Sequence, residues 1–177
     1  MTVYRKDLTA EYVREILNYD QATGVFTWLK RAPVTPGAKN FNTRFAGKGA
    51  GVVDRAGYLR IKIATPRYAA HRLAWLIVAG EWPPEDVDHI NGIKSDNRFS
   101  NLRLATRSQN NANVPAKSHN KLGIKGVCYK PRLGLYHAQI KKDGKVRGLG
   151  HYETPEEAHA AYVKAATEVH GEFARAE

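Results

Sequence analysis

The chain has 177 residues, and its 28 Lys or Arg residues outnumber 17 Asp or Glu residues, which makes the formal net charge +11. This length suits one or two small domains, and the positive charge favours a polyanionic partner, with nucleic acid as the first candidate. The sequence lacks an apolar run of roughly 18 residues, which argues against a membrane partner, and the single Cys128 excludes an intramolecular disulfide.

The N-terminal part of the chain predicts a mixed α/β extension. Apolar residues recur at helical spacing over residues 8–17, and the β-branched and aromatic run at 25–29 is typical of a strand. Residues 30–51 hold two prolines and four glycines among basic residues, so we expect a loop that either faces DNA or is simply solvated. The alternating run at 58–63 predicts a half-buried strand with a basic side.

Residues 69–79 predict a helix that packs beneath the segment following it. Their apolar side chains recur at helical spacing, and Gly80 and two prolines then end the pattern. His71 lies near the start of this helix and has two interpretations. It could bind a ligand or a phosphate, but a lone histidine beside an apolar face is more often structural, and we favour the structural role.

Residues 87–113 read VDHINGIKSDNRFSNLRLATRSQNNAN and hold the strongest functional signal in the chain. The run begins as a short strand, passes through an Asn-Gly turn, and continues as a second strand over 102–105. A capping box predicts a helix that begins just after Thr106. If the hairpin folds back on this helix, an Asp-His pair and later asparagines can meet.

These residue types suit a single-metal nuclease site. Such a site needs a hard oxygen ligand, an adjacent imidazole that takes a proton from water, and a second oxygen ligand from elsewhere in the chain. Asp88, His89 and Asn110 are the candidates. Asparagine and aspartate are also common in turns, so Asn97 and its neighbours have a second interpretation as turn formers only.

The pattern D-H-I-N-G, D-N-R, N-L-R-x-A-T and Q-N-x-x-N resembles the HNH endonucleases, in particular the homing type found in phages and introns. The resemblance implies a ββα-metal core at about 86–115, with Asp88 and Asn110 as metal ligands and His89 as the general base. It also implies that Asn101 pins the loop and orients the His89 ring. One oxygen-ligated ion per site suits Mg²⁺ or Mn²⁺ better than Zn²⁺.

Some residues of the motif keep two interpretations. Many members of the HNH family carry a histidine at the end of the motif, where this chain has asparagines. Asn113 could help to hold the metal or a water molecule, or it could serve in capping and packing. Three arginines could grip phosphates or be solvated and ion-paired surface residues: Arg98, Arg103 and Arg107.

A second module is expected after the motif. Residues 1–115 would form the first domain, the polar segment 116–123 a linker, and residues 124–177 a second domain. In that second domain, strand-like runs and an Asp-Gly hairpin precede a helix that begins at Thr154 with a capping box and a first-turn proline. The expected result is a small three-stranded antiparallel sheet with one covering helix.

The runs G-V, Y-H-A-Q-I, L-G-H-Y and T-P-E-E-A resemble the plant ethylene-response-factor (Apetala-type) DNA-binding domain over residues 123–173. The resemblance implies that the sheet lies in the major groove. Several arginines of the plant pattern are replaced here, so the preferred base sequence cannot be transferred. Residues 121–147 hold eight Lys or Arg against one acid, an excess that a merely solvated sheet would not show. The positions that correspond to DNA contacts are Lys130, Arg132, Tyr136, Gln139, Lys141 and Arg147.

Together these patterns predict an α+β protein that acts as a metal-dependent DNA endonuclease. The sheet would position double-stranded DNA while the ββα-metal core nicks it or cuts both strands, as a monomer or a homodimer. Residues 1–20 carry charges throughout and lack the apolar segment of a secretory signal, so we expect a phage or mobile-element protein in the bacterial cytoplasm. The alternatives are a catalytically silent DNA-binding regulator and, more distantly, an RNA-binding or RNA-cleaving protein.

Overall fold

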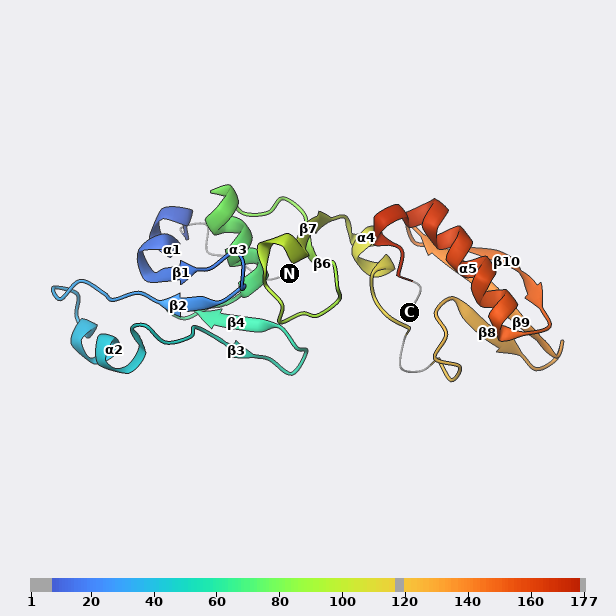
Figure 1. The fold of residues 1–177 in the computed structure, drawn as a ribbon, viewed down its shortest axis with the longest axis horizontal. Coiled ribbons are helices and arrows are strands. Elements are labelled where there is room, and N and C mark those ends of the chain that lie inside the picture. The colour runs from blue at the N-terminus through green and yellow to red at the C-terminus, as the bar shows by residue number, and fades with distance from the viewer. Residues whose placement is uncertain (1–7, 117–119, 176–177) are drawn as a thin grey trace. The chain divides into compact units, whose positions relative to one another are not determined.

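The computed structural model describes residues 8–116 and 120–175 (Figure 1). The chain divides into two compact units, Met1–Leu104 and Ala105–Glu177. This division precedes the expected linker at 116–123, of which residues 117–119 lie outside the described residues, so the linker stays a prediction. No helix among the described residues is long and apolar enough to span a bilayer.

The first unit is built from short helices and small antiparallel sheets. Strands β1 and β2 form a hairpin, β3, β4 and β5 form a sheet in that order, and β6 pairs with β7. The β7 strand runs across the division between the units. The elements are α1 Ala10–Ile16, β1 Leu17–Tyr19, β2 Phe26–Trp28, α2 Ala38–Phe45, β3 Val52–Val53, β4 Leu59–Lys62, β5 Arg67–Ala69, α3 Ala70–Ala79, β6 Asp86–His89, the 3-10 helix η1 Phe99–Asn101 and β7 Leu102–Ala105.

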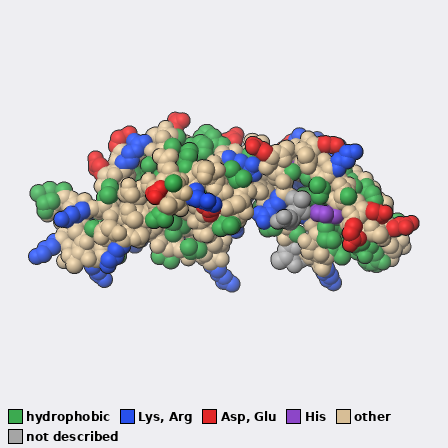
Figure 2. All heavy atoms as spheres, in the orientation of Figure 1, with side chains coloured by type: hydrophobic (Ala, Val, Ile, Leu, Met, Phe, Trp, Pro, Cys, Tyr) green, Lys and Arg blue, Asp and Glu red, His purple; other side chains and the backbone are tan. Residues whose placement is uncertain are grey.

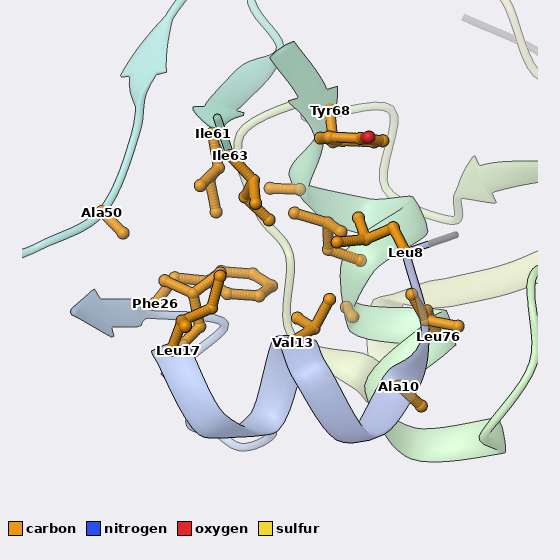
Figure 3. Packing of buried hydrophobic residues seen from close by; sticks show 14 of the residues in the cluster. Leu8, Ala10, Val13, Leu17, Phe26, Ala50, Ile61, Ile63, Tyr68 and Leu76 are labelled. Atoms are coloured by element: carbon orange, nitrogen blue, oxygen red, sulfur yellow. The ribbon is translucent and has the colours of Figure 1, made fainter. Parts of the chain in front are cut away.

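The core of the first unit lies between α1, α3 and the small sheets. Figure 3 shows buried side chains such as Val13, Phe26 and Ile61 directed into this core. The helix expected over 8–17 and the strand expected over 58–63 are confirmed as α1 and β4. Helix α3 also follows the prediction, and it ends where Gly80 adopts the left-handed conformation with φ of 82°.

The loop expected over residues 30–51 is wrong in part, because the structure contains the eight-residue helix α2 there. Tertiary contacts hold this helix. The Asn42 side chain accepts a hydrogen bond from the Arg31 backbone N–H at 2.8 Å and donates one to the Arg31 carbonyl at 2.9 Å. The Phe41 ring meets Trp28 edge-on, with centroids 5.5 Å apart. Asparagines and nearby glycines are poor local helix signals, so only these contacts explain the helix.

The second unit contains the predicted three strands and covering helix. Its antiparallel sheet has the order β10-β9-β8, and α5 packs against all three strands. The Asp-Gly hairpin is also confirmed, since Asp143 and Gly144 both have positive φ values, 48° and 82°. Both units therefore agree with an α+β fold. The elements are α4 Arg107–Ala112, β8 Val127–Lys130, β9 Leu135–Lys142, β10 Lys145–Tyr152, α5 Pro155–His170 and the 3-10 helix η2 Gly171–Phe173.

Helix α4 belongs to the second unit and begins with the predicted capping box. The Thr106 hydroxyl accepts a hydrogen bond from the Gln109 backbone N–H, and the Gln109 side chain accepts one from the Thr106 backbone N–H. Ala112 packs with Ala105 and Phe173 in a small cluster. The Ser108 hydroxyl accepts a hydrogen bond from the Asp143 backbone N–H at 3.2 Å. The helix of the HNH-like motif is thus packed with the elements that follow it.

Candidate active site around His89

Asp88 and His89 stand at the end of strand β6, where both side chains are buried. Asp88 is 6% exposed and His89 is 4% exposed. Strand β7 pairs with β6. Just beyond this pairing, the backbone N–H of Ile90, which follows β6, donates to the carbonyl of Asn101, which precedes β7, at 2.9 Å. A buried carboxylate beside a buried imidazole needs polar partners, because burying either group without them is costly.

Arg103 supplies the partner of Asp88. From β7 its Nε and Nη2 atoms both donate to Asp88 Oδ2 at 3.0 Å, and both side chains are largely shielded from solvent. A shielded guanidinium fork of this kind is a strong, charge-assisted contact. Of the two roles that the sequence left open for Arg103, the structure shows the ion pair.

Asn101 ties together the loop that leaves the Asp-His pair. Its Oδ1 accepts from the Asn91 backbone N–H at 3.0 Å, and its Nδ2 donates to Asn91 Oδ1 at 3.0 Å and to the Asp96 carbonyl at 2.8 Å. These bonds agree with the expectation that Asn101 pins the loop. Its contribution to catalysis stays a prediction.

Asn97 provides the hydrogen bond at the His89 ring. Its side chain is 1% exposed, and its Oδ1 lies 3.4 Å from His89 Nε2. The sequence leaves Asn97 with two interpretations, as part of the D-N-R motif or as a turn former only, and it assigns Asn97 no contact with His89. Its burial and its contact with His89 exist only in the folded protein.

Two further rings surround His89. The His71 ring meets it edge-on with centroids 4.9 Å apart, and the Tyr58 ring lies 6.2 Å away. His71 is buried, and its Nδ1 has no hydrogen-bond partner among the described residues. Burial lowers the pKa of His71 to about 3, so this ring stays neutral. Burial also lowers the pKa of His89, while its hydrogen bond with Asn97 acts in the opposite direction.

Arg98 is paired within the same loop. Its Nη2 lies 2.6 Å from Asp96 Oδ2, and its Nε donates to Asp96 Oδ1 at 2.9 Å. This hydrogen bonding holds the pKa of the Asp96 carboxyl well below its usual range. Half of the Arg98 side chain remains exposed, so the pair lies at the surface.

The structure brings Asp88, His89 and Asn101 together within the first unit. Asn110 lies half-buried on α4, and Asn113 is buried at the C-terminal end of that helix, so both belong to the second unit. Arg107 is exposed at the start of α4. That Asn110 and Asn113 bind the same metal ion as Asp88 therefore stays a prediction.

The donors available for a metal ion are oxygen atoms. Within residues 8–116 and 120–175, no three His, Cys, Asp or Glu side chains are grouped to hold a metal ion. A site would therefore combine the Asp88 carboxylate with side-chain amide oxygens, and this donor set fits a hard ion such as Mg²⁺ or Mn²⁺. Because Arg103 already donates twice to Asp88, metal and guanidinium would share that carboxylate.

The sheet of the second unit has a face covered by α5 and an open face. Val127 and Ala138, which pair across β8 and β9, are buried with Ala158 of α5. Tyr136 packs against this same cluster, so we leave it out of the DNA contacts proposed below. Alternate residues point to the other side of a strand. By that alternation the open face carries Lys130, Gln139 and Lys141, whereas Arg132 and Arg147 are exposed in the β8–β9 turn and on β10.

Comparison with known proteins finds a similarity in the region around His89. Residues 68–112 match a family model described as HNH endonuclease. The matched stretch runs from β5 to the end of α4 and contains Asp88, His89, Asn101 and Asn110. This match and the viral relatives support a nuclease. The matched stretch ends before the C-terminal sheet, and the Apetala-type resemblance stays a prediction.

Two relatives come from viruses. The chain is similar to "Uncharacterized HNH endonuclease L560" of Acanthamoeba polyphaga mimivirus, with 38% identity over 106 residues, which cover 59% of this chain and 54% of the relative. It is also similar to "Protein 3.8" of Escherichia phage T7, with 28% identity over 89 residues, which cover 50% of this chain and 73% of the relative. The chain thus spans about half of the mimivirus relative's length. No solved structure matches the protein.

Proposed function

We propose that this protein is a metal-dependent DNA endonuclease of the homing or phage type, with His89 as the general base. The observation that carries the proposal is the buried Asp88–His89 pair on β6, which lies inside the stretch that matches the HNH endonuclease family. Its viral relatives support an origin in a virus or mobile element. The similarity to a protein of phage T7 supports the proposal that it acts in the cytoplasm of a bacterial host.

In this mechanism His89 takes a proton from the water that attacks the scissile phosphate. A neutral imidazole is required, and burial favours it by lowering the pKa of His89. A divalent ion held by Asp88 and Asn110, with Asn113 as a further candidate donor, would neutralise charge on the phosphate and the leaving 3′ oxygen. Arg103 orients the Asp88 carboxylate through its two hydrogen bonds. One site per chain cleaves one strand, so a double-strand break needs a second binding event or a homodimer.

Cations on the second unit are proposed to hold the duplex. Lys130 and Lys141 on the open face and Arg132 in the neighbouring turn have no ion pair among the described residues. Gln139 lies between them on the same face and can donate to a base edge or a phosphate. Arg147 on β10 and Arg107 on α4 are exposed and are further candidate contacts. Arg147 pairs with the buried Ile140, so it lies on the other side of the sheet from Lys141.

Helix α2 is proposed as a second DNA-contacting element. Residues 21–53 contain no Asp or Glu, while they hold five Lys or Arg. Figure 2 shows Lys and Arg side chains projecting from the region where Figure 1 places α2. Four of the five are exposed, whereas the Arg31 guanidinium lies over the Phe41 ring at 3.6 Å. None of the five has an ion pair among the described residues, whereas Arg60 and Arg98 of the same unit are paired with carboxylates. Unpaired cations on an anchored helix suit a polyanion. The five are Lys30, Arg31, Lys39, Arg44 and Lys48.

One observation favours the second candidate function, a catalytically silent DNA-binding regulator. Arg103 donates two hydrogen bonds to the same oxygen of Asp88, and a guanidinium in this position can substitute for the metal charge. In that case the HNH-like region would serve as a scaffold. The two functions differ in whether any divalent ion supports cleavage.

The deciding experiment is incubation of the full-length protein with supercoiled plasmid and Mg²⁺ or Mn²⁺, with and without EDTA. We expect nicking that EDTA suppresses and that Asp88→Asn abolishes. Asp54→Asn is the matched control, because Asp54 also pairs with an arginine, Arg60, at 2.8 Å. Binding of DNA without cleavage by either ion would favour the regulator. Cleavage of RNA but not DNA would overturn the assigned substrate.

A further inference from the structure

We infer that Asn97 is a positioning residue that selects the tautomer of His89, and that the β1–β2 hairpin holds Asn97 in place for this task. The assignment of the tautomer depends only on the fold, whereas its consequence for the reaction rests on the proposed nuclease function. Neither Asn97 nor the hairpin belongs to the residues proposed above to bind the metal ion or to activate water.

The orientation of the Asn97 amide determines which of its ends faces His89. Its Nδ2 donates to the Ser95 carbonyl at 3.0 Å, so the opposite end, Oδ1, is turned toward His89 Nε2 at 3.4 Å. The reversed amide would place two acceptors, Oδ1 and the Ser95 carbonyl, against each other. The hydrogen-bond network therefore assigns this orientation without reference to any function.

An amide oxygen can only accept a hydrogen bond, so the nitrogen facing it must carry the hydrogen. His89 Nε2 is that nitrogen, and in a neutral imidazole the lone pair is then on Nδ1. Asn97 thus assigns the two ring nitrogens different tasks. Nε2 anchors the ring, and Nδ1 is the atom that takes the proton from water.

The β1–β2 hairpin fixes the backbone on which Asn97 depends. The Tyr19 hydroxyl on β1 donates to the Asn97 carbonyl at 2.7 Å, and the Phe99 backbone N–H donates to the Gln21 carbonyl at 3.0 Å. The hydrogen bond from Tyr19 joins two residues that are 78 positions apart in the sequence. Hairpin and loop are therefore clamped together on both sides of Arg98.

Gly24, in the turn of the hairpin, makes the closest approach. A Cβ atom at this position would lie 2.4 Å from the Arg98 nitrogen and 2.5 Å from the Asn97 carbonyl carbon. Its φ of +74° also lies in the region that favours glycine. The hairpin thus packs directly on the peptide bond that follows Asn97, and a side chain there would push the two segments apart.

The surroundings of His89 limit the other positions that its ring could adopt. His71 meets the ring edge-on, Tyr58 lies on another side, and His89 is 4% exposed. Removal of the Asn97 amide would therefore not let the ring turn into solvent. It would instead remove the acceptor that faces Nε2, so the tautomer with the hydrogen on Nδ1 would gain population.

The test is nitrogen-15 NMR of the imidazole rings in the full-length, metal-free protein, at a pH where His89 is neutral. We expect His89 Nε2 to carry the hydrogen in the wild type, and both tautomers to appear in Asn97→Leu, which has similar volume but no acceptor. Asn97→Asp keeps an acceptor toward Nε2 and should retain the wild-type tautomer, although it loses the donor to the Ser95 carbonyl. Its charge favours the protonated ring, so this variant is compared at a pH where its own His89 is neutral. The matched control is Asn42→Leu, because the Asn42 side chain also closes a loop through two backbone hydrogen bonds, here at Arg31.

Two milder changes test the hairpin. Tyr19→Phe removes the hydroxyl that holds the Asn97 carbonyl, and it should shift the tautomer ratio less than Asn97→Leu does. Gly24→Ala should shift the ratio more than Tyr19→Phe, since it forces the segments apart. A His89 tautomer with the hydrogen on Nδ1 in the wild type, or the same tautomer in Asn97→Leu as in the wild type, overturns the inference.

Kinetics provide the second readout. Asn97→Leu should lower kcat by about tenfold to a hundredfold, because a His89 ring with its hydrogen on Nδ1 cannot accept a proton at that atom. KM should be unchanged, since the DNA-binding residues remain intact. Asn97→Asp should recover most of this activity. If no DNA is cleaved under any condition, the nuclease proposal fails while the NMR result still decides the tautomer. If DNA is cleaved and kcat is unaffected by Asn97→Leu, the positioning role alone is refuted.

Discussion

The surroundings of His89 and the open face of the second unit use their charged side chains in opposite ways. Around His89 the charges have internal partners, since Arg103 pairs with Asp88 and Arg98 with Asp96. On the open face of the second unit, Lys130 and Lys141 have no ion pair among the described residues. Internal pairs orient a site, whereas unpaired surface cations bind polyanions by releasing counterions. The difference supports the proposed division, in which cleavage takes place around His89 and the open face of the second unit holds DNA.

The cores of the units also differ. Large side chains such as Phe26, Ile61 and Leu73 fill the core of the first unit, whereas Ala138, Ala158 and other small residues dominate beneath α5. All three tryptophans of the chain belong to the first unit. Tryptophan fluorescence therefore reports the unfolding of the first unit alone, which lets its stability be measured separately.

The strongest effect should separate catalysis from binding. His89→Ala should lower the cleavage rate by about 100-fold to 10,000-fold, because the general base is removed. DNA affinity, measured by fluorescence anisotropy in EDTA, should stay within about twofold of the wild type, since the cations are untouched. Cleavage at the wild-type rate would reject His89 as the base, and a large drop in affinity would show that the two units do not divide the work.

The converse change weakens binding and spares chemistry. Lys130→Gln with Lys141→Gln should lower DNA affinity by about tenfold to a hundredfold and reduce the slope of log affinity against log salt by about 0.9 for each phosphate that is no longer neutralised. The cleavage rate at saturating DNA should be unchanged. Lys164→Gln serves as the control, because Lys164 is exposed on α5, away from the open face. Equal salt slopes in both proteins would remove the sheet from the binding surface.

A third prediction concerns the buried imidazole of His71. Its pKa is about 3 in the folded protein, below the ordinary value of 6.5, so the unfolded chain binds more protons between these pH values. Stability is therefore fully present above pH 6.5 and lost as the pH falls toward 3, by at most about 1.4 kcal/mol per pH unit. The charged or titratable groups that act on it are His89, Arg72 and Arg60.

Urea unfolding followed by tryptophan fluorescence measures this slope in the first unit. His71→Asn should reduce the decrease in stability on acidification, and the decrease that remains would belong to His89 and the carboxylates. Absolute stability can change in this variant, so the slope is the quantity to compare. An unchanged slope would show that His71 is protonated in the folded protein.

The weakest effect is expected at α2. Lys39→Gln with Arg44→Gln should weaken DNA binding by about threefold to tenfold and lower the salt slope, because both side chains are exposed and flexible side chains contribute less. Arg67→Gln with Lys164→Gln is the charge-matched control and should bind more tightly than the α2 variant. If the two double variants bind alike, α2 adds only net charge, and DNA holding belongs to the second unit alone.

Local signals in the sequence predicted much of the fold. The capping boxes at Thr106 and Thr154, the left-handed Gly80 and the Asp143–Gly144 turn all appear as expected, because each depends on residues within about four positions of one another. Helix α2 was missed, since it is held by Asn42 contacts with Arg31 across 11 positions. The packing of Tyr136 against the cluster beneath α5 was missed for the same kind of reason.

The candidate chemistry could be inferred from the sequence alone, because an Asp-His pair, a later asparagine and a strongly basic chain are visible without a fold. Most of the helices and strands could be located in the same way. The folded structure was needed to establish which asparagine faces the His89 ring and which arginine neutralises Asp88. A hydrogen bond to a buried ring depends on how distant segments pack around that ring, which no local pattern encodes. In this protein the backbone that carries Asn97 is held by a hairpin whose Tyr19 lies 78 residues before it.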